Sequence, residues 1–101
     1  MARLDELATI NATGVQVTSG AGSAVVAIPN AADGNRARVV HIQATGNAYI
    51  RPGTSGTTCT ANDLLLSPNM FVRLNVQGFT HIAYIQETAA AKINITPLEV
   101  G

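Results

Sequence analysis

Short segments in which side chains alternate in character recur between residues 37 and 97. Within residues 70–77, one set consists of Met70, Val72, Leu74 and Val76, and the other of Phe71, Arg73, Asn75 and Gln77. Residues 92–96 repeat the pattern, with two isoleucines between polar neighbours. A period of two places successive side chains on opposite faces of a β-strand. One apolar and one polar face is typical of antiparallel sheets.

Turn signals separate about eight such segments, and no long amphipathic helix interrupts them. The predicted strands lie within residues 14–18, 23–28, 38–44, 48–51, 59–66, 70–76, 81–86 and 92–96. This spacing is typical of a β-sandwich or barrel. We predict an all-β fold: a single β-sandwich or jelly-roll-like domain of about eight short antiparallel strands over residues 14–101, preceded by an N-terminal arm over residues 1–13.

Local sequence also predicts how some strands connect and which residues form the core. The glycine-rich turn at residues 19–22 predicts a hairpin between the first two strands. Residues 87–91 fit either one helical turn or a hairpin loop, and Pro97 is expected to end the last strand. With no Trp and few aromatic residues, aliphatic side chains must fill the core. The predicted buried set includes Val40, Ile42, Val72, Leu74, Ile82, Ile93 and Ile95.

Composition and motif spacing argue against chemistry at an active site. The formal net charge is zero, so the chain has no overall attraction for nucleic acid. The carboxylates are scattered, and no His or Cys residues stand at metal-ligand spacing. The lone Cys59 has no evident base and is expected to be a small buried side chain, while each histidine should be half-buried or at a subunit contact. We therefore predict no catalytic, cofactor-binding or metal-binding residues. A glycine-rich phosphate loop at residues 20–23 is rejected because no helix or Gly-Lys-Ser/Thr follows.

The N-terminal segment and the second strand faces are the candidate interaction surfaces. Leu4, Leu7 and Ile10 are spaced three apart among charged residues, which suits either a helical turn or an extended arm. We favour an arm that docks on a neighbour, because so short a segment cannot order by itself. Phe71 is expected on a second face, with Val39 and Ile85. Burying such side chains between subunits favours a homo-oligomer, most simply a trimer.

No segment of about 20 apolar residues predicts a membrane span, and the acidic N-terminal segment does not fit a secretory signal. We therefore expect synthesis in the cytoplasm and no membrane partner.

A resemblance gives these features a context. Residues 38–53, 59–68 and 71–86 resemble small virion structural proteins of tailed bacteriophages, in particular capsid decoration (cement) proteins. The resemblance implies a non-enzymatic protein that binds the major capsid protein, or other virion proteins, and stabilises the head shell from outside. The implied location is the virion, assembled in the host cytoplasm. Two alternatives are a connector, tail or fibre component and a ligand- or carbohydrate-binding β module. The second is weakened by the few aromatic residues that could form a sugar platform.

Overall fold

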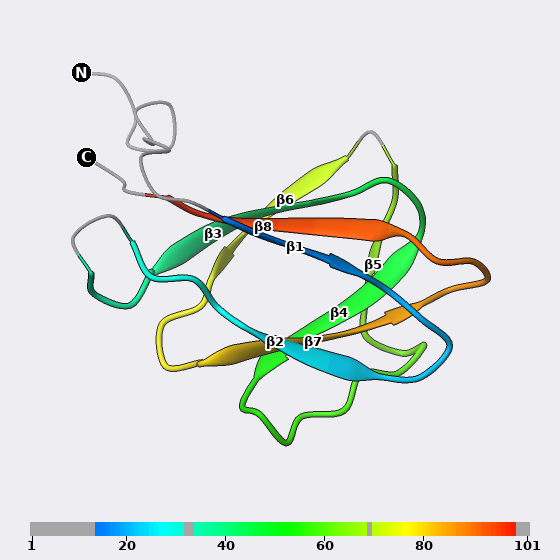
Figure 1. The fold of residues 1–101 in the computed structure, drawn as a ribbon, viewed down its shortest axis with the longest axis horizontal. Helices are drawn as coiled ribbons and strands as arrows, with labels where there is room; N and C mark the ends of the chain where they lie inside the picture. The colour runs from blue at the N-terminus through cyan, green and yellow to red at the C-terminus, as the bar shows by residue number, and fades with distance from the viewer. Residues whose placement is uncertain (1–13, 32–33, 69, 99–101) are drawn as a thin grey trace.

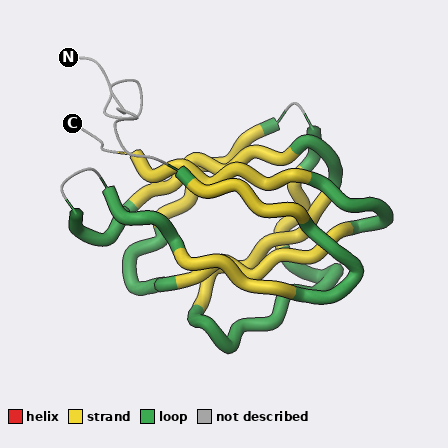
Figure 2. The backbone as a smooth tube through the Cα atoms, in the orientation of Figure 1, coloured by secondary structure: helices red, strands yellow, loops and turns green. Residues whose placement is uncertain are grey.

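The computed structural model describes residues 14–31, 34–68 and 70–98, and these form two four-stranded antiparallel sheets without a helix (Figures 1 and 2). The strands are β1 (Val15–Thr18), β2 (Ala24–Ala27), β3 (Val39–Ala44), β4 (Ala48–Gly53), β5 (Leu64–Leu66), β6 (Phe71–Asn75), β7 (His81–Gln86) and β8 (Lys92–Leu98). The predicted all-β class is confirmed. The prediction for residues 1–13, including Leu4, Leu7 and Ile10, lies outside the described residues.

The strand order places each strand of the second half of the chain beside a strand of the first half. One sheet has the order β1-β8-β3-β6 and the other β2-β7-β4-β5. The first strand thus pairs with the eighth, the second with the seventh, the third with the sixth and the fourth with the fifth. Pairs β3–β8 and β4–β7 then join these units into sheets.

Two predicted connections are wrong because neighbouring strands lie in opposite sheets. The turn at residues 19–22 does not close a hairpin: β1 pairs with β8 and β2 with β7. Residues 87–91 form neither a helical turn nor a hairpin loop, since they lead from β7 in one sheet to β8 in the other. A turn signal specifies a reversal of the chain, but it does not specify the partner of the strand that follows.

The last strand also extends further than predicted. Strand β8 continues through Pro97, which pairs with Val40 of β3. Strand β1 pairs with β8 only as far as Ile95. On the β1 side of β8, no described strand pairs with Pro97, so its missing N–H breaks no hydrogen bond of a described ladder there. Proline is tolerated in a strand where the strand edge is unpaired.

The core lies between the two sheets and is aliphatic. Of the predicted buried set, Val40, Ile42, Ile82, Ile93 and Ile95 are fully buried. Val72 and Leu74 share the inner face of β6 and pack against the core, but they are only half-buried because β6 is an outer strand. Cys59 is buried and His41 and His81 are half-buried, as predicted.

One buried polar residue joins two loops at an end of the sandwich. The Ser19 hydroxyl accepts a hydrogen bond from the Ala91 N–H at 2.9 Å and donates to the Ala91 carbonyl at 3.2 Å. The Ser19 N–H also donates to that carbonyl, at 2.8 Å. These bonds satisfy a polar group that would otherwise be costly to bury. They also tie the β1–β2 loop to the β7–β8 loop.

Candidate protein interface

Four large apolar side chains are exposed along one edge of the sandwich. Strands β5 and β6 are outer strands of their respective sheets and are joined by the short segment 67–70 (Figure 1). The four exposed residues are Leu64, Leu65, Met70 and Phe71, with exposed fractions of 44%, 42%, 61% and 53%. We call these four residues the β5–β6 edge. Large apolar side chains exposed on the outer strands of both sheets make this rim a candidate contact site.

Strand register explains why the leucines of β5 cannot all be buried. Leu66 pairs with Ala48 and is buried, whereas Leu64, on the same face, pairs with Ile50 but is open at the rim. Leu65 has the opposite parity and pairs with Tyr49 on the outer face. Three consecutive leucines in a strand therefore leave apolar surface exposed in either register.

Phe71 is held in a defined orientation by its neighbours. Its ring stacks on the His41 imidazole, with a centroid separation of 4.7 Å and an interplanar angle of 18°. The Arg73 guanidinium carbon lies 5.5 Å from the centroid of the Phe71 ring. His41 and Arg73 are directly opposed across strands β3 and β6. An exposed aromatic ring that is already ordered loses little side-chain entropy when a partner covers it.

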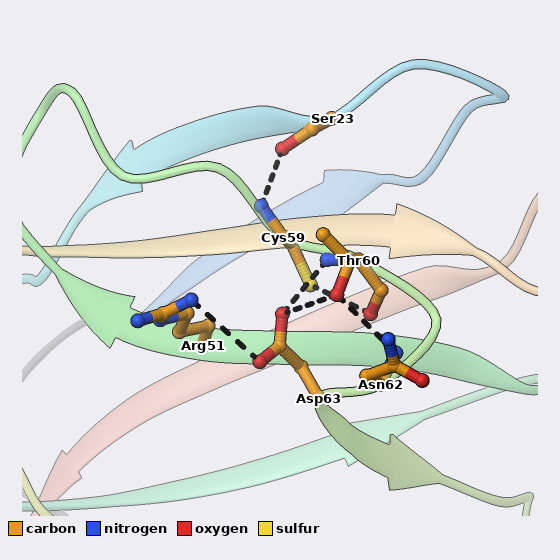
Figure 3. A network of polar contacts seen from close by, with 6 residues as sticks. All are labelled: Ser23, Arg51, Cys59, Thr60, Asn62 and Asp63. Carbon is orange, nitrogen blue, oxygen red and sulfur yellow. Dashed lines mark hydrogen bonds and ion pairs between the residues drawn. The ribbon is translucent and has the colours of Figure 1, made fainter.

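A polar network fixes the loop that precedes β5 (Figure 3). The Asp63 carboxylate accepts a hydrogen bond from the Thr60 N–H at 2.7 Å, and the Asp63 N–H donates to the Thr60 carbonyl at 3.1 Å. The guanidinium Nη1 of Arg51, in β4, lies 4.0 Å from the other carboxylate oxygen of Asp63. The Cys59 N–H donates to the Ser23 hydroxyl at 2.8 Å. The network links this loop to β4 and to the β1–β2 loop, and so positions the first leucine of β5.

The environment of Cys59 makes its thiol a poor nucleophile. Burial, followed by the negative charge of Asp63, raises the pKa of the Cys59 thiol to about 11. The thiol is therefore protonated at neutral pH, and the thiolate is the reactive form. The role that fits these facts is packing beneath the loop.

A second exposed polar group lies on the outer face of β4. The Tyr49 hydroxyl donates to Glu87 at 3.4 Å, and the Asn47 side-chain amide donates to the same carboxylate at 2.9 Å. Partial desolvation, followed by the Glu87 charge, raises the pKa of Tyr49. These contacts fasten the segment after β7 to β4.

The structure places Phe71, the one described residue of the predicted interaction set, at the β5–β6 edge. Leu64, Leu65 and Met70 were not predicted as interaction residues. Met70 was assigned to the face of Val72, but it precedes the strand and is exposed. The run of three leucines was the signal available in the sequence.

The described part of the chain shows neither a metal site nor a membrane-spanning helix. Among residues 14–31, 34–68 and 70–98, no group of three or more His, Cys, Asp or Glu residues could hold a metal ion. The same ranges contain no helix long and apolar enough to cross a membrane. Comparisons with protein-family models, curated proteins and solved structures gave no match for this chain.

Proposed function

We propose that the protein is a non-enzymatic structural component of a bacteriophage virion. Its most specific form is a capsid decoration protein that binds the outer face of the head shell and stabilises it. The observation that carries the proposal is the β5–β6 edge, where four large apolar side chains are exposed on outer strands of the two sheets. The resemblance of residues 38–53, 59–68 and 71–86 to small virion proteins supports the same conclusion.

We further infer that the two sheets form a jelly roll. Nested pairing, from the fourth and fifth strands outward to the first and eighth, is expected when one long antiparallel hairpin rolls into a sandwich. Jelly rolls of eight strands occur in viral capsid and lectin domains. Fold alone does not assign a function, so this inference supports the virion proposal only together with the exposed edge.

The energetics of the edge fit assembly through many weak contacts. Its side chains expose on the order of a few hundred Å². Burying that area contributes roughly 5–10 kcal/mol before the cost of association is subtracted. A single edge contact is therefore weak, whereas repeated contacts on a multivalent shell bind with high avidity. We propose self-association, most simply as a trimer, as one source of that multivalency, with the major capsid protein as the second partner.

The copy number in purified particles tests the virion proposal. Particles from the lysate of the phage that encodes the chain are separated by gel electrophoresis, and band densities are compared with that of the major capsid protein. A decoration protein gives a copy number comparable with that of the capsid protein. A small copy number instead indicates a connector, tail or fibre component. Absence of the chain from particles contradicts the proposal.

A further inference from the structure

Two small hollows share Phe79 in their lining, and no residue of the β5–β6 edge lines either of them. One has a volume of about 190 Å³ and the other about 170 Å³. Both are lined by Arg36, Ala37 and Phe79. Asn30 and Thr80 add polar groups to the larger hollow, and Arg38 and Gln77 to the smaller; we call the pair the Phe79 site.

Backbone hydrogen bonds fix the turn that carries Phe79. The Phe79 N–H donates to the Val76 carbonyl at 3.0 Å, which closes a β-turn, and Gly78 takes the positive φ of 94° at the third position. The Val76 N–H donates to the Arg38 carbonyl at 2.8 Å, and thus fixes the turn to the segment before β3. The Phe79 side chain is 42% exposed although the backbone around it is well bonded.

The arginines of the Phe79 site have no acidic partner among the described residues. Arg36 and Arg38 are exposed on either side of the buried Ala37, so alternation directs both outward. The two described carboxylate side chains are bonded elsewhere: Asp63 to Thr60 and Arg51, and Glu87 to Asn47 and Tyr49. No described carboxylate lines either hollow.

We propose that the Phe79 site binds an acidic peptide segment of a partner protein. A Glu or Asp side chain would bond to the guanidinium groups, which form charge-assisted hydrogen bonds with carboxylates. A neighbouring apolar residue would cover the exposed ring of Phe79. A peptide fits better than a nucleic acid because the lining mixes apolar and polar groups and the chain has zero net charge. Binding of such a peptide does not require the chain to be part of a virion.

The test is an NMR titration of the ¹⁵N-labelled full chain with the probe acetyl-Glu-Leu-Glu-amide. Backbone amide signals of Ile28, Asn30 and residues 36–38 and 76–80 should shift on addition of millimolar peptide, while those of β5 should not. The matched probe acetyl-Gln-Leu-Gln-amide should cause little change. A single-stranded oligothymidylate tests the nucleic-acid alternative, and it should bind more weakly than the acidic peptide.

Two variants connect the binding to the named side chains. Arg36→Gln and Phe79→Ser should each weaken peptide binding about fivefold to tenfold. The first variant removes a guanidinium group that bonds to the peptide carboxylate, and the second removes the aromatic ring that the apolar peptide residue covers. Lys92→Gln removes an exposed positive charge from β8 and should leave the affinity unchanged. Overlay of the remaining amide signals shows that the variants are folded. The proposal is overturned by an absence of shifts, by equal shifts with the Gln probe, by stronger binding of the oligonucleotide, or by unchanged affinity in both site variants.

Discussion

At the scale of single residues, Asp63 links local hydrogen bonding to the position of an interface strand. Its carboxylate accepts the Thr60 N–H, while its own N–H returns a bond to the Thr60 carbonyl. These bonds close the turn immediately before Leu64, the first residue of β5. An acidic residue before a leucine run was visible in the sequence, but its partners were not. They come from β4 and from residue 60, and only the folded chain brings them together.

The first prediction concerns the pH dependence of this turn. The Thr60 N–H, and to a smaller degree Arg51, hold the pKa of Asp63 below its ordinary value of 3.8. The folded state therefore binds the proton more weakly than the unfolded state. The carboxylate contributes stability above pH 3.8, and the contribution is lost as the pH falls through the lower folded pKa.

The variant Asp63→Asn tests that assignment because it keeps the side-chain shape and removes the charge. At about pH 6, the variant should melt a few degrees below the parent protein. The difference should shrink as the pH is lowered from there to about pH 3, because below 3.8 the unfolded state takes up the proton before the folded state does. A difference in melting temperature that is constant across this range would mean that the charge of Asp63 does not stabilise the fold.

At the scale of elements, the position of a strand within its sheet determines how deeply its apolar residues are buried, and so how much each contributes to the free energy of unfolding. Ile42 on β3 is flanked by β8 and β6 and is fully buried. Leu74 on β6 has a paired strand on one side only, among the described residues, and is half-buried. Alternation in the sequence assigned both side chains to the same interior, and it carried no information about which strand would lie at the rim.

The second prediction follows from that difference. Ile42→Ala should lower the free energy of unfolding by about 2–5 kcal/mol, the usual cost of truncating a packed core residue. Leu74→Ala should cost about 1–2 kcal/mol, because part of its surface is already in contact with water. Urea denaturation of both variants measures the two values. Equal losses would mean that β6 is covered as completely as β3.

The third prediction concerns a close approach between two strands. A Cβ atom at Gly14 would lie 2.6 Å from the carbonyl oxygen of Ile95 and 2.8 Å from the Thr96 hydroxyl oxygen. Gly14→Ala must therefore push the start of β1 away from β8, at a cost of about 1–3 kcal/mol. Gly22→Ala is the control, because nothing lies within 4 Å of its Cβ position. If both variants have the same stability in urea, the described packing of β1 on β8 is incorrect.

The extent to which the sequence predicts this fold differs between segments and pairings. The segment His81–Gln86 was predicted with the observed bounds of β7, and the inner faces of β3 and β8 were identified by their alternation. The pairing of β1 with β8 was not, because it joins residues about 80 positions apart and no local signal specifies it. For the candidate interface, only Phe71 was identified; Leu65 required the register of β5 against β4.

At the scale of the whole molecule, the two rims of the sandwich differ in the side chains that they expose. Strands β1 and β2 form one rim, and their exposed side chains are small or polar. Strands β5 and β6 form the other rim, where four of the five large exposed apolar side chains of the described residues lie. With charged residues making up only 12% of the chain, little electrostatic repulsion opposes contact between copies.

Sedimentation velocity at micromolar concentration tests the central claim, that the β5–β6 edge is a protein contact surface. We expect the parent chain to sediment as an oligomer, most simply a trimer. The double variant Leu65→Asp, Phe71→Asp should sediment as a folded monomer. Its melting temperature should be near that of the parent chain at a concentration low enough to dissociate the oligomer. Phe79→Asp, which changes a large apolar side chain of similar exposure outside the edge, should leave the oligomer intact. A monomeric parent chain, or a double variant that remains oligomeric, would contradict the assignment of this edge as a self-association surface.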